Sequence, residues 1–156
     1  MRRAIQFACL SLMLAMVTGL GPLSMQPAAA KETESLEKLR ERAEAAKGGD
    51  RAKLFMQAAE RGVEEANHNF ESGSVEQGQG QIKQAVSDAD EATDAARTSG
   101  KRLKKTELDL RKLVRRLSDI ERTLSVDDRP PVHEAVERLQ ELDRALLDRM
   151  FGRGGK

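Results

Sequence analysis

The chain contains no tryptophan and no tyrosine, and its aromatic residues are four phenylalanines. Large flat side chains dominate most ligand pockets and the energetically important centres of protein interfaces. A chain that lacks them is expected to form its core mainly from Leu, Ala and Val packed between helices. Charged residues make up 34% of the sequence, and this composition favours an elongated helical bundle over a compact enzyme.

Cysteine is almost absent as well. The single cysteine, Cys9, lies in a segment that we expect to be removed on export. Residues 31–156 therefore offer neither a disulfide nor a thiolate metal ligand. Without Arg2 and Arg3, the 27 basic residues fall to 25 against 26 acidic ones, a net charge of −1. This balance predicts no nucleic-acid partner.

The first thirty residues have the order of a secretory signal peptide. Two arginines precede an apolar run over residues 5–20, and three consecutive alanines end at Ala30. The apolar run is short for a membrane-spanning helix. We expect residues 1–30 to be cleaved near Ala30 and the remaining chain to be periplasmic or secreted, with an uncleaved signal anchor as the alternative.

The most regular feature is a seven-residue repeat of apolar side chains over residues 75–124. Its primary positions are Val75, Ile82, Ala89, Ala96, Leu103, Leu110, Leu117 and Leu124. Such spacing places the side chains on one stripe of a helix that requires partner helices. It predicts one continuous central helix of about fifty residues, roughly 75 Å long. A break at Ser99-Gly100 is the alternative, because Gly inside a helix costs about 1 kcal/mol relative to Ala.

Helical patterns also flank this repeat. Residues 31–49 predict a charged N-terminal helix followed by a Gly48-Gly49 linker. Residues 50–72 predict a helix that folds back antiparallel on residues 75–96, because the connection at Gly73 is short. Small residues would give this pair its closest approach: Ala59, Gly62 and Ala66 facing Ala85, Ala89 and Ala92.

Pro130 and Pro131 end the preceding element, and Pro131 is well placed in the first turn of a last helix, which reaches about Phe151. We expect this helix to pack on residues 103–124. The predicted fold is all-α, with a helical bundle domain over residues 50–151 and a flexible tail over residues 152–156.

Part of the second helix and of the repeat carries a family resemblance. The residues concerned are Ala66, Phe70, Gly73, Gly78, Ile82 and Ala85. Over residues 66–85 this pattern resembles a single tetratricopeptide-type helical hairpin, although Gly78 stands where Ala is usual and no second copy follows at about 34 residues. The resemblance implies hairpin geometry and no binding residues. The chain is otherwise similar to uncharacterised small exported bacterial helical proteins, which implies no activity.

The sign of the charges changes along the repeat. Residues 76–94 are mainly acidic and residues 97–116 mainly basic. Candidate site residues recur on the face opposite the apolar stripe: Arg97, Lys101, Lys104, Leu108, Arg111 and Arg115. Such a basic stripe could bind anionic lipid headgroups, cell-wall polyanions or an acidic partner protein. A solvated face, partly covered by the acidic first helix, is the alternative, because charge runs on helices usually face solvent.

Catalytic and metal-binding motifs are absent from the sequence. It has no Gly-x-Ser-x-Gly elbow, no phosphate loop and no thiol nucleophile outside the expected signal. The two histidines, His68 and His133, lack the spacing of zinc ligands, which converge in threes or fours. We therefore assign no catalytic, cofactor-binding or metal-binding residue, and we expect no cofactor and no small-molecule substrate.

These observations predict a non-enzymatic, exported structural or protein-interaction protein, a scaffold or adaptor of the bacterial envelope. It would bind a protein partner or associate with itself. Two alternatives remain: a periplasmic holdase-type chaperone, and a peripheral binder of anionic lipid or cell-wall surfaces through the basic stripe.

Overall fold

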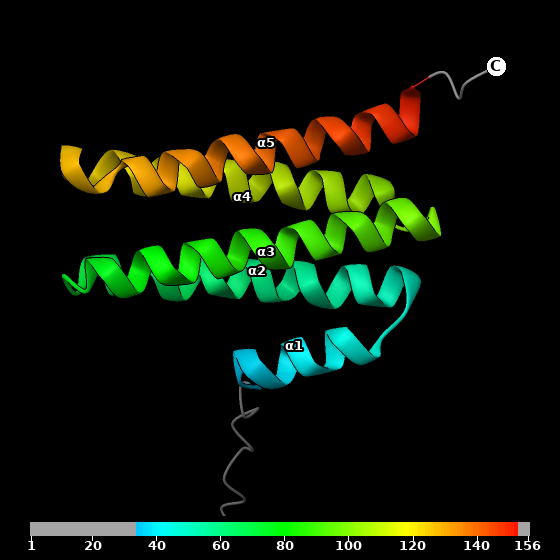
Figure 1. The fold of residues 1–156 in the computed structure, drawn as a ribbon, viewed down its shortest axis with the longest axis horizontal. Coiled ribbons are helices and arrows are strands. Elements are labelled where there is room, and N and C mark those ends of the chain that lie inside the picture. Colours follow the sequence, from blue (N-terminus) through cyan, green and yellow to red (C-terminus); the bar gives the residue numbers. More distant parts are fainter. Residues whose placement is uncertain (1–33, 153–156) are drawn as a thin grey trace, which may run out of the picture. The chain divides into compact units, whose positions relative to one another are not determined.

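The computed structural model describes residues 34–152, and within that range it contains helices and no β-strand (Figure 1). The helices are α1 (Leu36–Ala45), α2 (Gly48–Glu71), α3 (Val75–Ser99), α4 (Leu103–Thr123), the short 3-10 helix η1 (Val126–Asp128) and α5 (Pro130–Phe151). The predicted all-α helical bundle is confirmed. The predicted signal peptide and residues 153–156 of the predicted tail lie outside the described residues.

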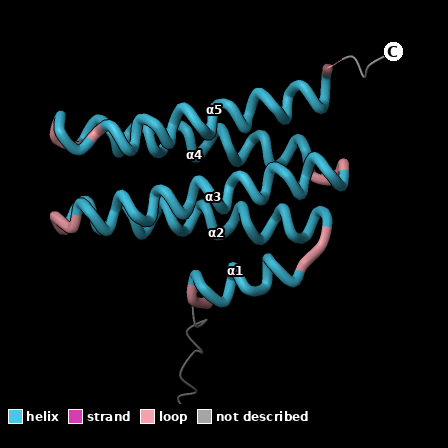
Figure 2. Tube along the Cα trace, viewed as in Figure 1, coloured by secondary structure: helices cyan, strands magenta, loops and turns pink. Residues whose placement is uncertain are grey.

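The four long helices α2 to α5 run in alternating directions, with their connections at the two ends (Figure 2). Helix α2 pairs with α3, α4 pairs with α5, and these pairs meet through α2–α4 and α3–α5 contacts. Helix α1 packs on α2. The described residues 34–152 form a compact unit with its own hydrophobic core. None of the helices between residues 34 and 152 is long and apolar enough to cross a membrane.

The predicted continuous helix over residues 75–124 is wrong, because the chain reverses at Gly100. Gly100 and Arg102 both have left-handed backbone conformations, with φ of 66° and 62°. The Ser99 hydroxyl stabilises the reversal, since it donates to the Ala95 carbonyl at 2.6 Å and accepts from the Lys101 N–H at 3.2 Å. Helix α4 therefore returns along the bundle and packs against α2, α3 and α5.

The seven-residue repeat nevertheless identifies the inward faces of both α3 and α4. Eleven of its primary positions and of the secondary positions three residues further on are buried: Gly78, Ile82, Ala85, Ala89, Ala92 and Ala96 in α3, and Thr106, Leu110, Leu113, Leu117 and Ile120 in α4. The inward face of α5 is buried in the same core through Val132, Val136, Leu139 and Leu146. Folding back at Gly100 brings α3 and α4 into one bundle, so their apolar stripes share a single core with α2 and α5.

The α2–α3 hairpin has the predicted close approach of small residues. A Cβ atom on Gly62 would lie 3.1 Å from the Cβ of Ala85, so a larger residue would push the helices apart. Near the turn, the ring of Phe70 packs on Gly78, where an added Cβ would lie 2.7 Å from the ring. Gly73 makes the turn between α2 and α3, with a φ of 79°.

The Gly48-Gly49 pair, predicted as a linker, instead begins α2, and the connection from α1 is made by residues 46–47. Gly48 has a φ of 57°. Gly49 is buried, and a Cβ atom there would lie 3.2 Å from the Cβ of Lys101. Glycine is required at both positions because the start of α2 packs closely on the α3–α4 turn. The sequence analysis did not predict this contact, because it placed residues 99–102 inside one continuous helix.

Candidate functional site

The six residues predicted as a basic stripe lie on the surface of two helices and the turn between them. Arg97 is in the last turn of α3, Lys101 is in the turn, and the other four follow one another along α4. The five basic side chains are exposed, and Leu108 is 43% exposed. The break at Gly100 bends the expected straight stripe around one end of the bundle.

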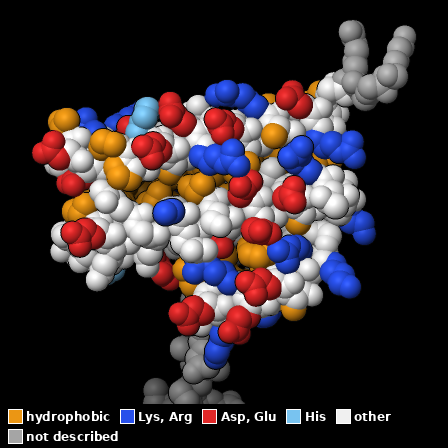
Figure 3. Space-filling model, viewed as in Figure 1, with side chains coloured by type: hydrophobic (Ala, Val, Ile, Leu, Met, Phe, Trp, Pro, Cys, Tyr) orange, Lys and Arg blue, Asp and Glu red, His pale blue; other side chains and the backbone are white. Residues whose placement is uncertain are grey.

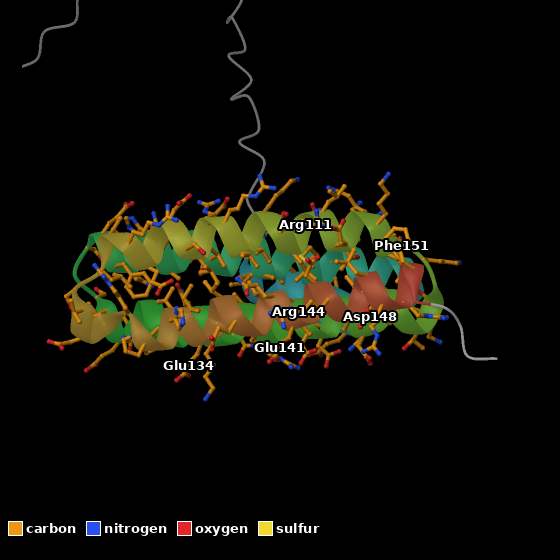
Figure 4. All side chains as sticks on the ribbon, turned by 90° about the horizontal axis from the view of Figure 1, so that it is seen from above. Arg111, Glu134, Glu141, Arg144, Asp148 and Phe151 are labelled. Carbon is orange, nitrogen blue, oxygen red and sulfur yellow. The ribbon has the colours of Figure 1, made fainter. Side chains whose placement is uncertain are left out.

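Arg111 differs from the other members of the stripe because it is held by carboxylates. Its guanidinium pairs with Glu107 of α4, and its Nε lies 3.6 Å from Oδ2 of Asp143 in α5. The other Asp143 oxygen is buried and has no hydrogen-bond partner within residues 34–152. Figure 4 shows Arg111 on the side of α4 that faces α5. Arg111 therefore joins α4 to α5, and it is less available to a ligand than Lys101 or Lys104.

Charge is divided between the two ends of the bundle. Residues 47–53, 94–105 and 144–152 meet at the end that carries the α3–α4 turn, and they contain ten basic and three acidic side chains, a net charge of +7. Residues 65–80 and 117–137 meet at the opposite end and contain nine acidic and two basic side chains, a net charge of −7. Basic side chains gather at the right-hand end in Figure 3. The change of charge sign along the sequence therefore gives the folded bundle one basic end and one acidic end.

A groove lies between α3 and α5, in the half of the bundle that carries the acidic end. It has a volume of about 510 Å³. Apolar side chains are visible in this hollow between α3 and α5 (Figure 3). Its lining comes from two helices: Glu76, Gln79, Gly80, Ile82, Lys83 and Val86 of α3, and Pro131, Glu134, Ala135 and Arg138 of α5.

The rim of this groove carries both signs of charge. Arg138 is held in place by Asp90 of α3 at 2.9 Å and Glu141 of α5 at 3.0 Å, and these hydrogen bonds raise the pKa of its guanidinium. Lys83 forms no ion pair with the described residues and is exposed. The groove therefore offers one anchored and one free cation.

A smaller cleft of about 170 Å³ lies between α2 and α4 and contains two carboxylates. Asp109 is 7% exposed and accepts hydrogen bonds from Lys105 at 2.8 Å and Lys112 at 3.3 Å. Partial burial, and secondly the charge of Asp109, raise the pKa of Glu60. Asp109 likewise raises the pKa of Lys105 through their hydrogen bond. Lys105 and Lys112 donate the hydrogen bonds that the Asp109 carboxylate needs, so the cleft is mainly a contact between α2 and α4.

Within residues 34–152, no group of three or more His, Cys, Asp or Glu side chains is placed to hold a metal ion. His133 lies on the surface, where its Nδ1 is 3.0 Å from a carboxylate oxygen of Glu121 and its Nε2 is 3.6 Å from one of Glu137. His68 is exposed beside Glu64 and Glu65. Each histidine thus has nearby carboxylates without a third converging ligand in this part of the chain.

The sequence analysis missed the α3–α5 groove, because it treated residues 75–124 as one helix and packed the last helix only on residues 103–124. Residues on α3 and α5 become neighbours only after the reversal at Gly100. The local signal for the reversal is the pair Ser99 and Gly100, because glycine inside a helix is unfavourable relative to alanine.

Comparison of the chain with protein-family models, with curated proteins and with solved structures finds no match in any of the three, so the residues and their geometry are the basis for the functional inference.

Proposed function

We propose that this chain is an exported, non-enzymatic interaction protein of the bacterial envelope that binds an amphipathic helix of a partner protein between α3 and α5. The observation that carries the proposal is the open groove of about 510 Å³ with an apolar floor. Helix-in-groove recognition uses apolar anchors at helical spacing, and such anchors match a groove that is bounded by two helices. The proposed envelope location rests on the signal-like order of residues 1–30.

The charges on the rim specify the chemistry of this partner helix. Glu76 and Glu134 lie toward the acidic end of the groove, and Lys83 and Arg138 lie further along it. Glu76 and Lys83 are separated by about two turns of α3, roughly 10 Å along the axis. A complementary helix carries a basic residue at one end of its apolar anchors and an acidic residue about two turns away, at the other end.

The chaperone alternative has less support from the surface. A holdase covers unfolded clients with broad apolar area, whereas within residues 34–152 the exposed large hydrophobic side chains are Leu108, Val126 and Phe151. The experiment below distinguishes a helix of a different protein from a helix of a second copy of this chain as the occupant of the groove.

The test uses two synthetic amphipathic helices with the same apolar anchors. One carries Lys opposite Glu76 and Glu134 and Glu opposite Lys83, and the other has these charges exchanged. We expect the chain to prefer the first peptide. Lys83→Glu should weaken binding of the first by about fivefold and strengthen binding of the second by a similar factor, as expected for a change of about 1 kcal/mol at a rim charge.

Two further variants test the floor of the groove. Val86→Asp should abolish binding of both peptides, because it places a carboxylate among apolar side chains. Lys38→Glu makes the same change in net charge as Lys83→Glu but lies on α1, outside the groove lining, and should leave both affinities unchanged. Equal binding of the two peptides to the parent chain and to Lys83→Glu would contradict the proposal. Dimerisation in sedimentation experiments that Val86→Asp abolishes would identify a second copy as the occupant.

A further inference from the structure

The basic end of the bundle combines two properties that are separate in the rest of the described surface. It carries a concentration of unpaired cations, and it displays large apolar side chains beside them. Among residues 34–152, eight exposed cations at this end form no ion pair: Lys47, Lys53, Arg97, Lys101, Arg102, Lys104, Arg144 and Arg149. Asp50, Asp94 and Asp148 are the acidic residues counted at this end, so the local charge stays strongly positive.

Leu108 and Phe151 supply the apolar component. Phe151 is 76% exposed and ends α5, and Leu108 is 43% exposed in the second turn of α4. The Arg111–Asp143 contact sets the register of these antiparallel helices. Phe151 follows Asp143 by eight residues, and Leu103 precedes Arg111 by eight residues. Because the helices are antiparallel, Phe151 therefore lies level with Leu103, the first residue of α4. Figure 4 shows Phe151 beyond Arg144 and Asp148 at this end.

We propose that this end binds the surface of an anionic phospholipid bilayer, with the bundle standing on its basic end. Cations near an anionic membrane are attracted to its headgroups, and adjacent Leu and Phe side chains can enter the boundary between headgroups and acyl chains. A soluble polyanion offers no apolar layer for Leu108 and Phe151. Their exposure beside the cations therefore favours a bilayer as the ligand.

The charge of the opposite end determines the orientation. Helix α3 has 25 residues, so the ends lie about 37 Å apart. Electrostatic interactions are screened over about 8 Å at physiological ionic strength. The two ends therefore act independently: the basic end is attracted to the anionic surface, and the acidic end with the α3–α5 groove is directed away from it. This inference does not require the groove to bind a partner.

The first experiment measures cosedimentation of a chain that begins at Lys31, which includes the whole compact unit. The probes are vesicles of phosphatidylcholine mixed with phosphatidylglycerol and vesicles of phosphatidylcholine alone. We expect binding to the mixed vesicles that weakens with salt. The double variant Lys101→Glu/Lys104→Glu should bind at least roughly thirtyfold more weakly, which follows from the typical attraction of each cation to an anionic surface.

The matched control is Lys38→Glu/Lys83→Glu, which makes the same change in net charge outside the basic end. It should bind the mixed vesicles much more tightly than the double variant of the basic end. Equal weakening of the two double variants would overturn an oriented interaction, and so would equal binding of the parent chain to both kinds of vesicle.

The absence of tryptophan makes the orientation directly measurable. A single tryptophan is introduced as Phe151→Trp, as Leu108→Trp or, at the acidic end, as Val126→Trp. Val126 is 75% exposed, which matches the 76% of Phe151. With mixed vesicles, we expect a blue shift and quenching by lipid-attached quenchers at 151 and 108, and neither effect at 126.

Three results would overturn the proposal. Quenching at 126 equal to that at 151 excludes the orientation. Tight binding of inorganic polyphosphate without quenching at 151 by vesicles identifies a soluble polyanion as the ligand. Self-association that Lys101→Glu/Lys104→Glu abolishes, without vesicle binding, shows that the basic end instead meets the acidic end of another copy.

Discussion

Arg40 of α1 holds the buried carboxylate of Asp88 in α3. Its Nε donates to Oδ1 and Oδ2 of Asp88 at 3.2 and 2.9 Å, and its Nη2 lies 2.8 Å from Oδ2. The Asp88 side chain is 3% exposed and that of Arg40 is 23% exposed. The pair is therefore asymmetric: the base retains contact with water and the acid does not.

We predict that Arg40→Leu lowers the free energy of unfolding by about 3 kcal/mol, because it leaves an unpaired carboxylate in a buried position. Asp88→Ala should lower it by less, about 1–2 kcal/mol, because the partly exposed guanidinium of Arg40 can turn to water. Urea denaturation measures both values. Equal losses, or a larger loss for Asp88→Ala, would contradict the asymmetry.

The α3–α4 reversal predicts opposite effects at two neighbouring positions. Gly100→Ala should lower the free energy of unfolding by about 1–2 kcal/mol, because a side chain in the left-handed region strains the backbone. An added Cβ meets no atom within 4 Å there, so the loss is conformational. Arg102→Gly should raise stability by up to about 1 kcal/mol because it relieves the same strain. If denaturation instead showed that Gly100→Ala stabilises the protein, the result would support a continuous helix through residue 100.

Two glycines in the first turns of α3 should respond differently to the same substitution. Gly80→Ala should stabilise the bundle by about 0.5–1 kcal/mol, since the new Cβ meets no atom within 4 Å and Ala favours helix. Gly78→Ala should destabilise it by up to about 2 kcal/mol, because the Phe70 ring must move. Thermal unfolding of the two variants provides the comparison, and identical shifts would exclude the Phe70–Gly78 contact.

Glu60 predicts a pH-dependent difference in stability. Partial burial and Asp109 raise its pKa, against the opposing charges of Lys112 and Lys105, so the folded state disfavours its charged form. Glu60→Gln should therefore stabilise the bundle at neutral pH. The difference between parent and variant should shrink as the pH falls toward the ordinary glutamate pKa, below which Glu60 is protonated in both the folded and unfolded states. Denaturation curves over that pH range test the sign, and a difference that grows on acidification would contradict it.

The sequence predicted which side chains enter the core better than it predicted how the helices are connected. Ile82 and Leu117 keep one seven-residue phase, and both are buried. The phase identifies an inward stripe on each helix, but every helix of an antiparallel bundle has such a stripe. The three residues that follow Ser99 reverse the chain without changing the seven-residue spacing, so an unbroken spacing does not require an unbroken helix.

Surface features depended more strongly on that connection. The exposure of Lys104 and Leu108 followed from the helical pattern of α4 alone, and the structure places both on the surface. The α3–α5 groove brings Lys83 near Arg138, which are 55 positions apart in the sequence. No local periodicity reports such a pair, because their proximity results from the direction in which α4 leaves the Gly100 turn.

The attachment of α1 has a consequence for the order of unfolding. This ten-residue helix is joined to α2 by two residues, and it contributes only Leu39 and Ala43 as fully covered side chains. Its amide hydrogens should therefore exchange with solvent through a separate opening event, at a lower free energy than those of the four longer helices. The Arg40–Asp88 ion pair contributes much of the free energy of that opening. Helix α1 can therefore detach from the bundle while α2 to α5 remain folded.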